Sequence, residues 1–182
     1  EFRRVLFRSP LFHIPAARWA GEDLKGKTVL VVAEQGLGDE VMFSNMLPDI
    51  LEMLGPDGRM TLVVEHRLKS LIERSYPGVE VSAHRTMKHE GRVYRTAPYV
   101  QDWDRFDCWA PLGDFLRHLR NTVEAFPNRK SFLTPDPERV AYWKAELDNL
   151  GPSPKVGLLW KSLSLKGDRA RQFSPFQLWE PV

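Results

Sequence analysis

The stretch that decides the fold runs from Val29 to Ile50 and reads VLVVAEQGLGDEVMFSNMLPDI. It begins inside a mostly β-branched run, residues 28–33, which is typical of a strand buried on both faces of a parallel sheet. A turn with two glycines follows, and apolar residues then recur at helical spacing. Strand, turn and amphipathic helix together predict the first unit of an α/β fold, with the turn at the carboxyl end of the strand.

The same alternation continues along the chain. Further strands are predicted at residues 60–64, 79–83 and 106–109, and helices at residues 39–54, 66–75, 112–120 and 138–150. Residues 84–98 lose this periodicity, carry many basic side chains, and are interpreted as a solvated loop. The order of these elements predicts a doubly wound, Rossmann-like parallel sheet.

The chain is divided into segments by its composition. We interpret residues 1–9, EFRRVLFRS, as the translation of a sequencing adapter and exclude them from the fold. Residues 10–27 are interpreted as a lead-in linker, and residues 28–150 as an N-terminal Rossmann-like domain. After the proline-rich linker 151–154, the strand pattern KVGLLW predicts a second, truncated domain over residues 155–182. The hypothesis is therefore an open-reading-frame fragment.

The composition restricts the class of protein. Of 182 residues, 26 are basic and 24 acidic, and the net charge of +2 gives no argument for a nucleic-acid or membrane partner. No apolar run is long enough for a transmembrane segment. The one cysteine, Cys108, excludes an internal disulfide and favours a reducing, cytoplasmic location; it is interpreted as a core thiol.

Asp39, at the tip of the glycine turn, allows three interpretations. A dinucleotide-binding turn needs a third glycine where Val41 stands, and Asp39 would repel a pyrophosphate. A helix N-cap is a common role for aspartate and contributes about 1 kcal/mol. A general base at the mouth of the sheet could take a proton from a sugar hydroxyl, with Gly36 and Gly38 leaving room for the substrate. The cap and base roles are compatible if each uses one carboxylate oxygen.

The string EQGLGDEVMFSNMLPDI resembles the start of the bacterial glycosyltransferase-like domain that often follows tetratricopeptide repeats. That domain is related to the heptosyltransferases of lipopolysaccharide synthesis (glycosyltransferase family 9) and more remotely to the O-GlcNAc transferases. The lead-in from Trp19 to Lys27 and the string VGLLWKS at residues 156–162 also resemble parts of that family. The resemblance runs from about residue 18 to residue 182 and is loose over residues 84–135.

The resemblance implies a GT-B fold, in which two Rossmann-like domains face each other and the second binds the nucleotide-sugar donor. It implies that Asp39 activates the acceptor hydroxyl, and Gln35, beside Gly36 and Gly38, is placed to orient Asp39 or the substrate. Basic side chains in place of a metal would stabilise the departing phosphates. The candidate phosphate-binding residues are Lys161, Ser162 and Arg171. Neither a metal nor a cofactor is implied.

Other motifs are given a structural interpretation. The DxD string at residues 102–104 could bind a metal, but such strings are frequent by chance. The basic run 84–95 could contact an anionic acceptor, and the solvated-loop interpretation is preferred.

The sequence therefore predicts part of a metal-independent glycosyltransferase that moves a sugar from a nucleotide-sugar to an acceptor hydroxyl. The acceptor could be a glycan, a lipid-linked sugar or a protein. The fragment itself is expected to be inactive, because most of the donor-binding domain is missing. The alternative is a non-catalytic Rossmann-like binding or scaffold module attached to tetratricopeptide repeats. A nicotinamide-dependent oxidoreductase is a third interpretation, and we expect no binding of that cofactor.

Overall fold

The computed structural model describes residues 11–12, 14–34, 36–90 and 92–159, together with residues 173, 175 and 178. The chain divides into two compact units, residues 1–137 and 138–182. All the strands of the described part belong to the first unit.

The main sheet of the first unit has four strands, all parallel. In spatial order they are β4 (Glu80–Ala83), β3 (Arg59–Val64), β2 (Thr28–Val32) and β7 (Cys108–Pro111). Strand β2 pairs with β3 on one side and with β7 on the other, and β3 pairs with β4. The predicted parallel sheet is thus confirmed, and the arrangement is compatible with a Rossmann-like fold.

Strand β2 is buried on both faces, which explains its continuous apolar sequence. Val29, Val31 and Ala33 lie in the larger core cluster, while Leu30 and Val32 lie in a smaller cluster. All five side chains are at most 2% exposed. Burying a side chain of this kind stabilises the fold by about 1.5–3 kcal/mol, so β2 is the natural centre of the sheet.

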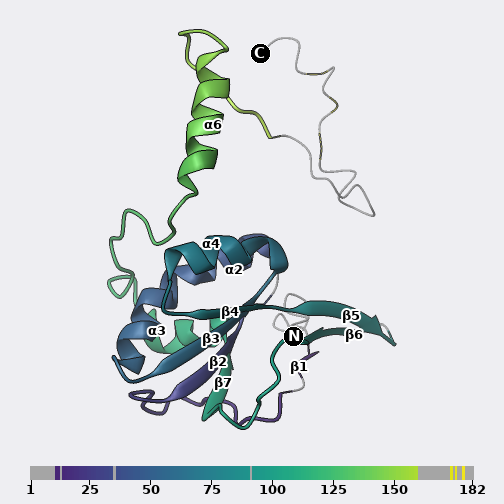
Figure 1. The fold of residues 1–182 in the computed structure, drawn as a ribbon, viewed down its shortest axis with the longest axis vertical. Helices are drawn as coiled ribbons and strands as arrows, with labels where there is room; N and C mark the ends of the chain where they lie inside the picture. The colour runs from purple at the N-terminus through teal and green to yellow at the C-terminus, as the bar shows by residue number, and fades with distance from the viewer. Residues whose placement is uncertain are drawn as a thin grey trace. The chain divides into compact units, whose positions relative to one another are not determined.

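The helices pack against the larger cluster and begin where strands end. After β2 come α2 (Leu37–Phe43), a 3₁₀ turn at Ser44–Met46 and α3 (Leu47–Leu54). After β3 come a 3₁₀ turn at His66–Leu68 and α4 (Lys69–Ser75). Figure 1 shows α2, α3 and α4 together on one side of the strands.

The predicted single helix over residues 39–54 is wrong in two respects. It begins earlier, at Leu37, and the 3₁₀ turn divides it. Pro48 is the second residue of α3 and lies in its first turn, where its missing N–H costs no helical hydrogen bond. Gly55 ends α3 with a φ of 67°, a left-handed conformation that favours glycine.

The interpretation of residues 84–98 as a loop is wrong. Strands β5 (Arg85–His89) and β6 (Arg92–Thr96) form an antiparallel hairpin, and β1 (Leu11–Phe12) pairs parallel with β6. Figure 1 shows this second sheet extending beside the main one. The hairpin is mostly exposed, so its sequence lacks the apolar alternation by which a half-buried strand is recognised.

The remaining elements of the first unit also have bounds that differ from the predicted ones. The strand expected at residues 106–109 is β7, at Cys108–Pro111, and its register pairs Val29 with Cys108. The helix expected at 112–120 is a 3₁₀ turn (Leu112–Phe115) followed by the short helix α5 (Leu116–Leu119).

The face of the main sheet opposite the helices is covered differently from the prediction. A doubly wound sheet has helices on both faces, but in the described residues this face is packed by lead-in and loop side chains. They include Phe12, Ile14, Val100, Trp103 and Phe106. No helix in the described part of the chain is long and apolar enough to cross a bilayer.

The second unit contains α6 (Pro137–Asp148), which agrees with the predicted helix at 138–150. Val140, Trp143 and Leu147 on this helix are about half exposed. The predicted strand KVGLLW is not formed over residues 155–159, and Trp160 lies outside the described residues. A parallel strand needs neighbours to pair with, and none of the described residues pairs with this segment.

We predict that Leu62→Ala destabilises the protein by about 2–5 kcal/mol, because it leaves a cavity under a central strand. Leu62 is 0% exposed in β3. Urea unfolding measures the change, with Val123→Ala, at a side chain 81% exposed, as the matched control. Equal midpoints for the two variants would contradict the assignment of Leu62 to the core.

Candidate functional site

The strand order of the main sheet places a crevice between two particular strands. Counted along the chain, the parallel strands β2, β3, β4 and β7 are first to fourth, and their spatial order is third, second, first, fourth. The chain therefore builds outward from β2 through β3 to β4 and then returns to the other side of β2. In open α/β sheets the carboxyl ends of the strands at such a switch point form the ligand crevice. Here those ends are at Val32 and Pro111.

The glycine turn begins at this edge, and Asp39 holds it together. Gly36 is the N-cap of α2, so Asp39 is the third helical residue and not the N-cap that its position in the sequence suggested. Its Oδ2 accepts a hydrogen bond from the Gly36 N–H at 2.9 Å. This bond satisfies a backbone donor at the helix start, and Asp39 stabilises the turn in the manner of a capping-box residue.

Gly38 is the glycine of the turn that has open space beside it, because a Cβ there would meet no atom within 4 Å. Gly36 has a φ of −99°, which any residue can adopt. A Cβ on Gly36 would, however, lie 3.2 Å from Oδ2 of Asp39, a tight contact with the oxygen that accepts its N–H. The turn therefore leaves open space on its outer side, which a ligand could approach closely.

Glu34 is a second carboxylate in the crevice, and it crosses from β2 toward β7. A Cβ on Gly113 would lie 2.5 Å from Oε1 of Glu34, so the carboxyl group rests against the backbone that follows β7. Burial, followed by the negative charge of Asp114, raises the pKa of Glu34. Arg18, Arg95 and the Gly113 N–H oppose this shift without cancelling it. A partly buried carboxyl group with a raised pKa in a ligand crevice is a candidate acid or base.

A buried charged cluster, which we call the Glu40 cluster, lies directly behind the turn. It consists of Glu40, His84 and Arg95, whose side chains are 1%, 4% and 8% exposed. Oε1 of Glu40 lies 2.9 Å from Nε2 of His84 and 3.1 Å from a guanidinium nitrogen of Arg95. Oε2 accepts the Glu65 N–H at 2.7 Å. The segments that directly follow β3 and β4 are thus tied to α2.

Arg95 extends the cluster to the last residues of β2. Its guanidinium donates to the Ala33 carbonyl at 2.7 Å. Burial lowers the pKa of Arg95, and the carboxylates of Glu40 and Glu34 counteract that effect. Sequence reasoning missed all three members, because it placed His84 and Arg95 in a solvated loop. One available signal was Glu40 itself, a charged residue in the inward stripe of an amphipathic helix.

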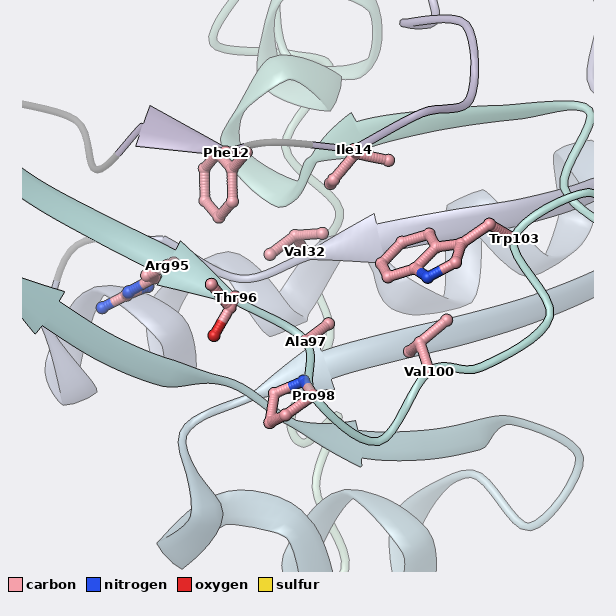
Figure 2. A pocket seen from close by; sticks show the side chains of 9 residues that line it. All are labelled: Phe12, Ile14, Val32, Arg95, Thr96, Ala97, Pro98, Val100 and Trp103. Atoms are coloured by element: carbon pink, nitrogen blue, oxygen red, sulfur yellow. The ribbon is translucent and has the colours of Figure 1, made fainter.

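A cavity of about 250 Å³ adjoins the same strand end on the face opposite the helices. Figure 2 shows Arg95 and Trp103 on its two sides, with Phe12, Ile14 and Val32 between them. The remaining lining residues are Thr96, Ala97, Pro98 and Val100. The walls are largely apolar, so this cavity suits a ring or a hydrocarbon group.

Several predicted site residues are not brought into this picture. Gln35, Lys161, Ser162 and Arg171 lie outside the residues that the structure describes. Within the described part, no group of three His, Cys, Asp or Glu side chains could hold a metal ion, and the two aspartates of the 102–104 string are exposed. Cys108 is buried in the larger core cluster, as predicted, and burial raises the pKa of its thiol.

The fold is that of an α/β protein with a parallel four-stranded sheet flanked by helices, compatible with a Rossmann-like fold. The chain is 65% identical over 182 residues to "Protein FlbA" of Caulobacter vibrioides (strain ATCC 19089 / CIP 103742 / CB 15). The match spans all of this chain and 30% of the length of FlbA. No protein-family model matches the chain, and no solved structure matches it.

We predict that Glu40→Gln costs about 3–5 kcal/mol of unfolding free energy, because it leaves the buried Arg95 cation without its carboxylate. Adding Arg95→Met to this variant removes the cation of the pair as well. The double variant should therefore lose less than the sum of the single losses. Chemical unfolding of the wild type, the two single variants Glu40→Gln and Arg95→Met, and the double variant measures the single losses and their coupling. The control, Glu52→Gln on the exposed side of α3, should change stability by about 0.5 kcal/mol or less. Additive losses would contradict the coupling.

We predict that Glu34→Gln stabilises the protein at about pH 8 and has no effect at about pH 3.5. A carboxyl group with a raised folded-state pKa contributes stability that is present below its unfolded pKa and lost as pH rises through its folded pKa. Glutamine mimics the protonated form of Glu34. The stabilities of the two proteins should therefore differ only at a pH high enough for the wild-type carboxyl group to ionise. Thermal unfolding of both across the pH range measures the difference. A variant less stable than wild type at the higher pH would contradict the prediction.

Proposed function

We propose that this chain is the N-terminal, Rossmann-like part of a GT-B glycosyltransferase. The parent protein would transfer a sugar from a nucleotide-sugar donor to an acceptor hydroxyl without a metal. The donor would bind mainly in a second domain that begins near residue 155. Lys161, Ser162 and Arg171 would bind the donor phosphates there, as the resemblance of VGLLWKS and its trailing arginines implies.

The observation that carries this proposal is the pairing of an open glycine turn with carboxylates at the switch point of the sheet. Gly38 leaves space outside the turn, and Asp39 and Glu34 are the acidic residues nearest to the two glycines in sequence on the two sides. A hydroxyl group can approach such a turn, whereas a phosphate would meet like charge. Activation of a hydroxyl requires a base, which either carboxylate could supply. The resemblance assigns this role to Asp39.

The chain spans 30% of the length of the relative that it matches, so the activity belongs to the proposed parent and not to this chain alone. We propose a bacterial, cytoplasmic parent in which this domain is attached to tetratricopeptide repeats. The acceptor is a glycan, a lipid-linked sugar or a protein. The second candidate is a non-catalytic module with the same fold, which would bind a sugar nucleotide or a partner without turnover.

We predict that the full-length parent releases nucleoside diphosphate from at least one donor in a panel of nucleotide-sugars, and that Asp39→Asn lowers this turnover about tenfold or more. The expected loss follows from weakening the hydrogen bond of about 1 kcal/mol that holds the turn, and from any part that Asp39 takes in proton transfer. Coupled detection of the released diphosphate measures turnover, and calorimetry measures donor affinity, which should not change.

The matched control is Glu52→Gln, an exposed acid on α3 that the proposal leaves outside the site. Donor binding without turnover would favour the non-catalytic module. An absence of both binding and turnover across the panel would overturn the glycosyltransferase proposal.

A further inference from the structure

The outer strand of the second sheet has an edge that no strand of the described residues covers. Strand β5 pairs with β6 alone, and β6 lies between β5 and β1. In an antiparallel pair, alternate residues direct their backbone N–H and C=O groups away from the partner strand. The outward groups of β5 therefore form a row of donors and acceptors, which is a template for one more strand.

One face of this hairpin carries basic side chains around an apolar centre. Side chains alternate between the two faces of a strand, and the register pairs Met87 with Tyr94 and His89 with Arg92. Arg85, Met87 and His89 thus share one face of β5, and Arg92 of β6 lies on the same face. Both arginines are exposed, and Met87 is 49% exposed. A strand added to β5 would meet a basic side chain near each end and an apolar side chain between them.

The charge of the hairpin selects the kind of strand that can be added. Residues 85–96 contain four Arg or Lys residues and one acid, a formal charge of +3 in a chain whose total is +2. One of these cations, Arg95, is buried and paired with Glu40, so three cations and one acid remain for the rest of the hairpin. A second copy of β5 would bring like charges opposite one another, which disfavours pairing between copies of the chain. An acidic strand would instead meet the opposite charge.

A cavity of about 360 Å³ adjoins the start of the same strand. Arg85 and Thr86 of β5 line it, together with Tyr99, which is 67% exposed. The rest of the wall comes from the ends of β3 and β4 and the residues that follow them. Where a peptide adds to a sheet edge, backbone hydrogen bonds supply affinity, and a side-chain pocket beside the edge supplies specificity. The described part of the chain has both features at one place.

We propose that the free edge of β5 and the adjoining cavity bind an extended, acidic segment of a partner protein, which pairs with β5 as an additional strand. Acidic side chains of the segment lie beside Arg85 and Arg92, an apolar side chain lies beside Met87, and a side chain near one end enters the cavity. This inference does not depend on the proposed function, because binding requires no sugar transfer and both candidate functions accommodate it.

The experiment uses the full-length parent and a synthetic peptide that matches this face, acetyl-Ser-Glu-Thr-Val-Thr-Glu-Ser-amide. Hydrogen exchange measured by mass spectrometry should slow in the fragment that covers residues 85–89 when the peptide is added, because the outward N–H groups of β5 become hydrogen-bonded. A fragment from α6 should exchange at an unchanged rate. Fluorescence anisotropy of the labelled peptide measures its affinity.

Two altered peptides separate strand pairing from simple attraction between charges. A peptide with the same side chains and an N-methylated backbone keeps the charge but donates no backbone hydrogen bond, so it should bind about tenfold or more weakly. A peptide with lysine in place of each glutamate should not bind. Equal binding of either altered peptide would overturn the proposal, and so would unchanged exchange of residues 85–89.

Variants of the parent test the same surface from the other side. Arg85→Glu should weaken binding of the acidic peptide about tenfold and permit binding of the lysine peptide, a rescue that a misfolded variant could not produce. Tyr99→Ala should weaken binding through the cavity alone, and therefore by a smaller factor. The matched control is Arg117→Glu, at an exposed arginine on α5, which should change neither affinity. Binding to phosphatidylglycerol vesicles that Arg85→Glu abolishes, with no binding of the acidic peptide, would assign the surface to a membrane and overturn the proposal.

Discussion

The site depends on the hydrogen bonds and ion pairs of one buried group, the carboxylate of Glu40. It binds a histidine that follows β4, an arginine from β6 and a backbone N–H that follows β3, while that arginine also binds the last carbonyl before Glu34. A lone carboxylate this deeply buried would be too costly to keep ionised, so these partners have to be present together. The charge that ties the strands together thus also fixes where the glycine turn begins.

This constraint explains why the second sheet matters for the glycine turn, to which it contributes no backbone. Strand β6 supplies Arg95, and Arg95 reaches across to β2 from a ribbon that is otherwise largely exposed. The ribbon is therefore anchored to the main sheet by charge at one point and by apolar contacts near Phe12 and Ala97. The hydrogen bond of 2.7 Å from Arg95 to the Ala33 carbonyl would transmit a change in the hairpin to the residue that directly precedes Glu34.

Much of the main sheet could be predicted from the sequence, because a strand buried on both faces has a local signature. Strands β2, β3 and β4 were found from β-branched runs within one residue of their bounds. The Glu40 cluster could not be found in this way. Its members are 44 and 55 residues apart along the chain, and no local period encodes which distant cation a buried acid will meet. The exposed hairpin was missed because its side chains bury too little to impose a pattern.

The aspartate at the tip of the glycine turn now has a physical explanation. A turn that binds phosphate has free N–H groups that can donate to the anion. Here the Gly36 N–H already donates to Asp39, so this donor is not free for a phosphate. Open space remains beside Gly38, and the partly buried carboxyl group of Glu34 lies just before the turn in the chain. Such an edge attracts a neutral hydrogen-bond donor more readily than an anion. Asp39 thus argues against a dinucleotide, and under the proposed function the same turn would accept a hydroxyl group.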